Sequence, residues 1–249
     1  MHTPNTPVTG ARYWAGLCCA SVLGCNTGDF IARLLHLGHT SGLIPEAFLF
    51  GMIILAERRL RFRTEAYYWL AIVTMRTAAT NLGDATKHVL ALPWPVALGG
   101  LAAALVAVQV AEKFLTPRHP DEVATGIPNT NAFYWLTFLV AGALGTVGGD
   151  YVSDIVGLGD GMGTVVLTGV VAVVLSARAV LGLIGRPFYW GTVVLVLCAG
   201  TTGGDYFAGQ HGLNWGLPIS SAVCAVAMIG LLLLWRTPER AAGVAFSAP

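Results

Sequence analysis

Residues 133–154, FYWLTFLVAGALGTVGGDYVSD, contain a pattern from which the architecture of the chain can be predicted. It opens with a Tyr-Trp pair, continues as an apolar run and ends in Gly-Gly-Asp. An apolar run of this length is long enough to cross a lipid bilayer as a helix. An open strand would leave its backbone polar groups unsatisfied in lipid, so the stretch predicts a transmembrane helix with an acid near one end.

This pattern occurs four times along the chain. The aromatic pairs are Tyr13-Trp14, Tyr68-Trp69, Tyr134-Trp135 and Tyr189-Trp190. Fifteen residues after each Trp comes an Asp that follows a Gly: Asp29, Asp84, Asp150 and Asp205. Successive Trp residues are 55, 66 and 55 positions apart. Each repeat holds two apolar runs, and this even number keeps the four repeats in one orientation, so they are parallel repeats.

The composition places the chain in a membrane. Of its 249 residues 55% are hydrophobic and 11% charged, with a mean hydropathy of +0.68, whereas soluble domains carry about 25% charged residues. This excludes an ordinary soluble enzyme and a disordered chain, and a net charge of +1 excludes a nucleic-acid partner. We expect an all-α polytopic protein of eight transmembrane helices, at about 13–32, 41–57, 66–86, 94–112, 132–153, 161–181, 187–207 and 216–235.

One long linker divides these spans. Residues 113–131 contain three prolines and separate a first membrane half, 1–112, from a second, 132–235, with a tail at 236–249. Basic residues gather on one side of the predicted topology, where both termini lie: Arg12, Arg58, Arg59, Arg61, Arg63, Lys113, Arg118, Arg178, Arg186, Arg236 and Arg240. The opposite loops contain Arg33 and Lys87. Because Lys and Arg favour the cytoplasmic side, the termini, linker and tail are predicted to be cytoplasmic.

Acidic residues show the reverse distribution. They fall in or near the outer half of the spans, at Asp29, Glu46, Asp84, Asp150, Asp154, Asp160 and Asp205. Such a cluster would form a negative outer vestibule that concentrates cations. The alternative is that acids are tolerated outside because only Lys and Arg set the orientation.

The four-fold motif resembles the bacterial membrane-protein repeat family of unknown function called DUF347, also catalogued as "membrane-anchored protein". The resemblance extends over about residues 12–235 and is closest in the stretch 133–154. It implies an eight-helix, multi-pass protein of the bacterial inner membrane. It implies no activity, so a function has to be argued from the residues.

The repeated acids are the main candidates for that function. Asp29, Asp84, Asp150 and Asp205 would lie within membrane depth, where ionisable groups face an interior, a partner or water. Glycines before Asp150 and Asp205 are expected to weaken or break the helix and free carbonyl oxygens. Further oxygen ligands precede the acids at Asn26, Asn81, Thr146 and Thr201. The alternative is that each acid caps a helix end or pairs with a neighbour.

Three other groups of residues raise alternatives. Arg76 lies near the middle of its span and interrupts the repeat, which favours a tethered counter-ion or anion site, or a structural ion pair with one of the repeat acids. Histidines near the acids could bind a metal or sense pH, or could be ordinary loop residues: His36, His39, His88 and His211. The Tyr-Trp pairs are expected to form an aromatic belt at the membrane interface.

Two functions fit these observations. The first is a transporter for a small solute or ion, more specifically a cation, with the repeat acids and Arg76 around a central site. The second is an intramembrane binding or sensor protein that acts through a partner. The sequence contains no nucleophile–base motif, so we expect no enzyme. It identifies neither a metal nor a cofactor, and it leaves association into a homo-oligomer open.

Overall fold

The computed structural model describes residues 7, 9–60, 64–116, 128–183 and 185–235. Within them the chain forms eight long helices: α1 (Ala11–Asp29), α3 (Leu43–Arg59), α4 (Ala66–Asp84), α5 (Trp94–Leu115), α7 (Ala132–Asp150), α8 (Gly159–Leu181), α9 (Arg186–Ala208) and α10 (Gly216–Leu234). A short helix, α2 (Gly38–Ser41), precedes α3. Three π-helical turns continue α1, α4 and α7, namely η1 (Phe30–Leu34), η2 (Ala85–Val89) and η3 (Tyr151–Ile155). The long helices coincide with the eight predicted stretches to within a few residues, and the described part contains no strand.

Six helical segments are long and apolar enough to cross a membrane. They are Ala11–Leu34, Gly38–Arg59, Trp94–Leu115, Ala132–Ile155, Gly159–Leu181 and Gly216–Leu234. Helices α4 and α9 are less apolar. Helix α4 carries Arg76 and Asp84, helix α9 carries Arg186 and Asp205, and both contain Thr and Gly residues. Both helices bury most of their residues inside the bundle, so protein surrounds their polar side chains.

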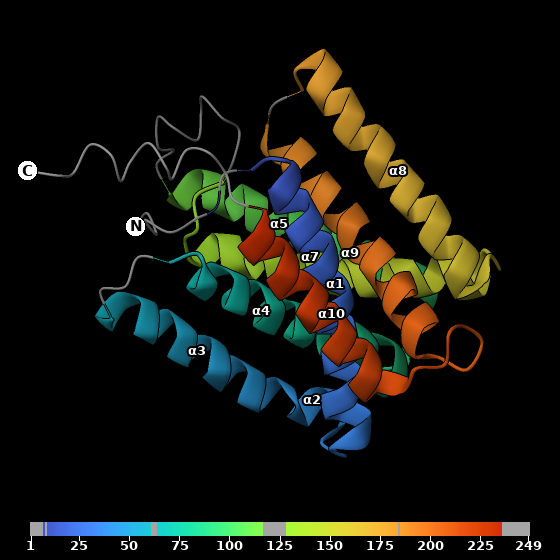
Figure 1. The fold of residues 1–249 in the computed structure, drawn as a ribbon. Coiled ribbons are helices and arrows are strands. Elements are labelled where there is room, and N and C mark those ends of the chain that lie inside the picture. Colours follow the sequence, from blue (N-terminus) through green and yellow to red (C-terminus); the bar gives the residue numbers. More distant parts are fainter. Residues whose placement is uncertain (1–6, 8, 61–63, 117–127, 184, 236–249) are drawn as a thin grey trace, which may run out of the picture.

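The helices that carry the motif form the centre of the molecule. These inner helices, α1, α4, α7 and α9, pack in a closed ring in that order, with α9 returning to α1. The four peripheral helices cover them, with α3 on α4, α5 on α7, α8 on α9 and α10 on α1. Each peripheral helix therefore packs on the inner helix of the next repeat, and the last repeat closes onto the first. Figure 1 shows α3 and α8 on opposite flanks of the bundle and α10 in front of α1.

Small residues allow the inner helices to approach closely. Each inner helix carries a small-xxx-small pair that ends at the Gly before the motif Asp: Gly24 and Gly28, Ala79 and Gly83, Gly145 and Gly149, Gly200 and Gly204. A Cβ on Gly83 would lie 2.9 Å from the Cβ of Thr146, and one on Gly149 would lie 2.8 Å from the Cβ of Thr201. The expectation of broken helices at these glycines is wrong, since α7 continues to Asp150 and α9 to Ala208.

The ring has two chemically distinct ends. We call the end where the inner helices begin the tyrosine end, and the end with the motif acids the aspartate end. The described basic residues of the predicted cytoplasmic set lie at the tyrosine end, where α1 and α9 begin and α3, α5 and α8 finish. Five residues of that set lie outside the described residues: Arg61, Arg63, Arg118, Arg236 and Arg240. Most of the predicted linker (117–127) and the tail (236–249) also lie outside them.

A buried ion pair joins the two halves of the chain at the tyrosine end. Glu112 of α5 is fully buried, and its carboxylate lies 3.0 Å from Arg186 Nη1 at the start of α9. The Asn131 amide donates a hydrogen bond to Glu112 over 2.9 Å, and the Asn131 side-chain oxygen caps α7 by accepting from the backbone N–H of Tyr134. The end of the first half is thus fixed to two helices of the second.

Candidate functional site

Four tyrosine hydroxyls close the ring at the tyrosine end. The motif tyrosines are buried and form a closed hydrogen-bonded cycle, which we call the tyrosine ring: Tyr13, Tyr68, Tyr134 and Tyr189. The four oxygen–oxygen distances around the cycle are 3.0, 2.7, 3.0 and 2.6 Å. A tyrosine hydroxyl has one O–H donor and an oxygen that can accept a hydrogen bond. Each tyrosine can therefore donate a hydrogen bond to one neighbour and accept one from the other. The ring fills the axis between the inner helices.

The motif tryptophans pack around this ring. Each Trp makes an edge contact with its own Tyr and also lies against the Tyr of the preceding inner helix, as Trp69 does on Tyr13 at 5.8 Å and Trp190 on Tyr134 at 5.3 Å between ring centroids. All four tryptophans are at most 8% exposed. The predicted aromatic belt is therefore wrong, because these side chains face the bundle interior and hold neighbouring repeats together.

Arg76 fills the next layer of the axis. It is completely buried, and its guanidinium donates five hydrogen bonds. The acceptors come from all four inner helices: Ser21 Oγ at 3.2 Å, Thr80 Oγ1 at 2.8 Å, Thr146 Oγ1 at 2.8 Å, Thr201 Oγ1 at 2.7 Å and the Leu197 carbonyl at 3.3 Å. Every N–H of the guanidinium is used. Because these acceptors are neutral and no donor is left over, the geometry fits neither the ion pair nor the anion site considered for Arg76.

This Arg76 layer is halfway between the tyrosine ring and the motif acids. Arg76 is eight residues after Tyr68 and eight before Asp84 on the same helix. At 1.5 Å per residue each step is about 12 Å along the axis. Thr80 and Thr201 donate their own hydroxyls to the carbonyls four residues earlier, which leaves their lone pairs for the guanidinium.

Beyond the Arg76 layer, the axis opens into a polar cavity of about 680 Å³ at the aspartate end, which we call the acid cavity. All four motif acids line it, together with Asp154 and Asp160: Asp29, Asp84, Asp150 and Asp205. Thr80, Thr146 and Thr201 also line it, and their bonds to Arg76 make them its floor. The basic side chains on its wall are Arg33, His88 and His211, so carboxylates predominate.

The motif acids differ in their partners, and this breaks the four-fold symmetry. Asp29 lies 3.3 Å from Arg33 Nη2, and Asp84 lies 3.3 Å from His39 Nδ1. Asp150 and Asp205 form no ion pair with any basic residue that the structure describes. The motif carboxyl groups without a basic partner therefore lie in the half of the acid cavity formed by α7 and α9.

The other predicted residues divide between this cavity and its surroundings. Arg76 does not line the cavity but lies beneath its floor, whereas Thr146 and Thr201 belong to the floor itself. Asn81 is buried beside it, where its amide bonds to Glu46 and its carbonyl oxygen contacts His39. Asn26 is buried against Gly204, and no described residue hydrogen-bonds its amide.

The predicted histidines also separate. His88 and His211 line the cavity, and His39 pairs with Asp84 behind it, whereas His36 is exposed on the turn before α2. In the described part of the chain, no three His, Cys, Asp or Glu side chains come close enough together to hold a metal ion. The acid cavity itself, at about 680 Å³, is larger than a bare ion.

Three residues at the acid cavity were not predicted. Thr80 is four positions before its motif Asp, as Thr146 and Thr201 are before theirs, and aligning the repeats would have found it. Cys25 occupies this position in the first repeat. Ser153 lies in the π-helical turn η3 on the cavity wall, is 7% exposed, and its hydroxyl lacks a hydrogen-bond partner among the described residues. Nothing in the sequence marks it, since a π turn has no clear sequence signal.

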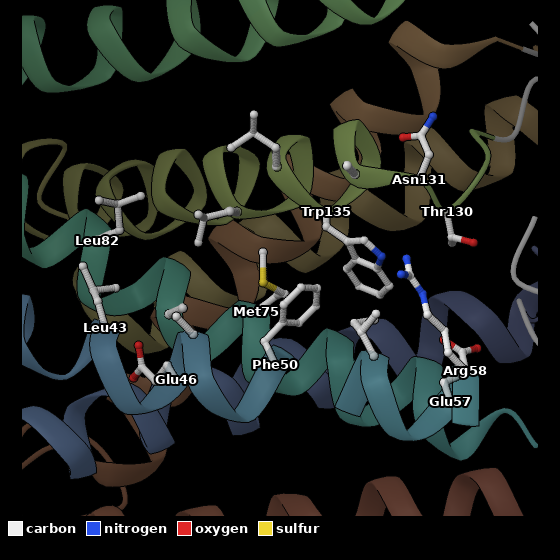
Figure 2. Close-up of a pocket in the computed structure, with 16 residues that line it drawn as sticks. Leu43, Glu46, Phe50, Glu57, Arg58, Met75, Leu82, Thr130, Asn131 and Trp135 are labelled. Carbon is white, nitrogen blue, oxygen red and sulfur yellow. The ribbon is translucent and has the colours of Figure 1, made fainter. Parts of the chain in front are cut away.

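A second cavity lies on the flank of the bundle, and we call it the apolar groove. It has a volume of about 990 Å³ and is lined by α3, α4 and α7 together with Thr130 and Asn131 before α7. Figure 2 shows Phe50, Met75 and Trp135 in its middle. Glu46 lies near Leu43 and Leu82 at one end, while Glu57, Arg58, Thr130 and Asn131 lie at the other.

Comparison with known proteins agrees with the repeat. The family model "Repeat of Unknown Function (DUF347)" matches residues 133–181 and 188–241. These two matches correspond to the third and fourth occurrences of the motif. No curated protein and no solved structure matches the chain.

Proposed function

Because this chain is a DUF347-repeat protein and the repeat brings no assigned activity, we propose a function from its geometry: a multi-pass membrane carrier for a small cation. The observation behind this proposal is the convergence of the four repeat acids on one cavity at the end of the helix ring. Repeat symmetry alone would place four equivalent acids around the axis, but it does not explain why the axis is open there. At the tyrosine end the same axis is filled by side chains, whereas at the aspartate end it leaves a polar cavity.

In this proposal all eight long helices cross the bacterial inner membrane and both termini are cytoplasmic. The support is the position of the described basic residues at the tyrosine end, since Lys and Arg favour the cytoplasmic side. The acid cavity then opens toward the outside. Helices α4 and α9 cross as inner helices, with their polar residues turned into the bundle and away from lipid.

Charge and size define the substrate class. Carboxylates around a partly enclosed space attract cations and raise their local concentration. Ligand sites typically measure about 300–1,000 Å³, and the acid cavity, at about 680 Å³, lies in this range. Since the described acids do not converge on a bare metal ion, the proposed substrate is a hydrated or organic cation bound between Asp150 and Asp205, with the Ser153 hydroxyl as an additional ligand.

The filled axis favours a carrier over an open pore. The Arg76 layer and the tyrosine ring both close the path between the acid cavity and the tyrosine end. A cation can pass only if these layers separate, which requires a second conformation. Transport of this kind alternates access to one site from the two sides.

The test is uptake by proteoliposomes that contain the purified protein, with radiolabelled sodium, rubidium and tetraethylammonium as probes. We expect uptake of at least one probe, loss of that uptake in Asp150→Asn and Asp205→Asn, and full uptake in the control Glu57→Gln at the opposite end of the bundle. Equal uptake by the wild type and both Asn variants would refute the acid site. A probe that binds without uptake would refute transport and support the binding or sensor alternative.

A further inference from the structure

The apolar groove contains a carboxylate that the acid cavity does not use. Glu46 of α3 lines the groove and is 3% exposed. One of its oxygens, Oε1, accepts a hydrogen bond from the Asn81 amide over 2.6 Å. The other, Oε2, is buried and has no hydrogen-bond partner among the residues that the structure describes. A buried carboxylate oxygen without a donor is unfavourable, so this atom indicates a ligand that brings one.

The walls of the groove define the rest of that ligand. Phe50 and Trp135 make an edge-to-face contact at 5.3 Å between ring centroids, and Met75 lies beside them in Figure 2. A predominantly apolar groove with a few polar groups at its ends is the usual form of a site for a small organic molecule. A lipid tail alone would cover these walls and still leave Oε2 without a donor.

We propose that the apolar groove binds an amphiphilic amine, with its ammonium group on Glu46 and its apolar body along Phe50, Met75 and Trp135. An ammonium group supplies both the positive charge and the N–H donors that Oε2 lacks. Arg58 is twelve residues from Glu46 on α3, about 18 Å along the helix. That other end of the groove holds Glu57 and Arg58, whose charges are opposite, so a cationic head is favoured at the Glu46 end.

A chain of polar contacts connects this site with the acid cavity. It runs from Glu46 through Asn81 to His39, which lies 3.1 Å from the Asn81 oxygen and 3.3 Å from Asp84. The Glu46 carboxylate is thus held in place by the same residues that support one wall of the acid cavity. The groove is nevertheless a separate site, and binding there does not depend on transport by the acid cavity.

The test compares decylamine with decanol, which have the same chain but differ in charge. The full-length protein is placed in nanodiscs of zwitterionic lipid, and its unfolding temperature is measured by tryptophan fluorescence as each probe is added. We expect decylamine to raise the unfolding temperature in a saturable manner and decanol to leave it nearly unchanged. Glu46→Gln, which keeps an oxygen for Asn81, should weaken decylamine binding at least tenfold, whereas Glu57→Gln at the other end of the groove should bind as the wild type does.

Two results would overturn the proposal. If decanol stabilises the wild type as much as decylamine does, the groove holds an apolar chain without a charged head. If Glu46→Gln binds decylamine with wild-type affinity, the carboxylate is not its partner. If the Glu46 variant does not fold, the two probes are compared on the double variant Asp150→Asn, Asp205→Asn, which lacks the proposed cation site of the acid cavity. A decylamine response equal to that of the wild type then comes from the groove, and loss of the response overturns the proposal.

Discussion

Closure of the helix ring between the last and first repeats can be tested with one methyl group. Gly200 of α9 faces Ser21 of α1, and a Cβ at Gly200 would overlap the Oγ and Cβ of Ser21 and lie 3.0 Å from its carbonyl carbon. The Ser21 side chain accepts a hydrogen bond from Arg76, and its backbone belongs to a buried helix, so neither can move aside freely. We therefore expect Gly200→Ala to force α1 and α9 apart.

The magnitude follows from a matched substitution in the same helix. Gly191 also belongs to α9, and a Cβ there would meet nothing within 4 Å. Exchanging Gly for Ala inside a helix stabilises it by about 0.5–1 kcal/mol, and both variants gain this contribution. Their difference isolates the overlap at Gly200, which for a tightly packed site costs about 1–3 kcal/mol, and we expect about 3 kcal/mol because a backbone atom is involved.

The assay is reversible unfolding by SDS in mixed micelles, followed by tryptophan fluorescence. Gly191→Ala should unfold at the same SDS fraction as the wild type or a higher one, and Gly200→Ala at a clearly lower one. If the two variants unfold together, α9 does not pack on α1 through Gly200, and the closed ring of inner helices is wrong.

Two further predictions concern the tyrosine end. Tyr68→Phe should lower the free energy of unfolding by about 1–3 kcal/mol, because it opens the hydroxyl cycle and leaves buried hydroxyl partners unsatisfied. The control Tyr67→Phe, at the neighbouring position, should change it little. Equal effects of the two substitutions in SDS unfolding would contradict the hydroxyl cycle. Arg186→Met should lower the free energy of unfolding by about 3–5 kcal/mol, because Glu112 then stays buried without its positively charged partner. Arg178→Met serves as the control. A small, equal loss of stability in both variants would show that the Glu112–Arg186 ion pair does not join the two halves.

The sequence predicted the helices and their repeat well. Fixed spacing from Trp to Asp established four equivalent units, and apolar length located the eight helices, because both signals are local along the chain. Asp150 and Asp205 could be expected to share a cavity since pseudo-symmetric units place equivalent residues around a common axis. The glycines before Asp150 and Asp205 were expected to break their helices, and this was wrong, because the helices continue and the glycines allow close packing.

The sequence could not predict features that depend on how the helices are rotated and packed against one another. Whether a Tyr-Trp pair faces lipid or the axis depends on which side of its helix is buried, and the near-uniform apolarity of α7 conceals that side. The five bonds of Arg76 require hydroxyls from three other helices, whose relative rotation the repeat alone does not give. The pairing of Asp29 and Asp84 depends on Arg33 and His39, which lie outside the repeated motif.

Thermal unfolding of the purified protein tests whether the acid cavity binds a cation. The probes are sodium, potassium, magnesium, manganese and tetramethylammonium chloride, each compared at constant ionic strength in detergent. A ligand at a hundred times its dissociation constant adds about 2.7 kcal/mol to the stability of the state that binds it, which raises the unfolding temperature measurably. We expect at least one of these cations to stabilise the wild type, and we expect Asp150→Asn and Asp205→Asn to lose the response. If no cation stabilises the wild type, or if both variants respond as it does, the acids are structural and the proposed cation site is wrong.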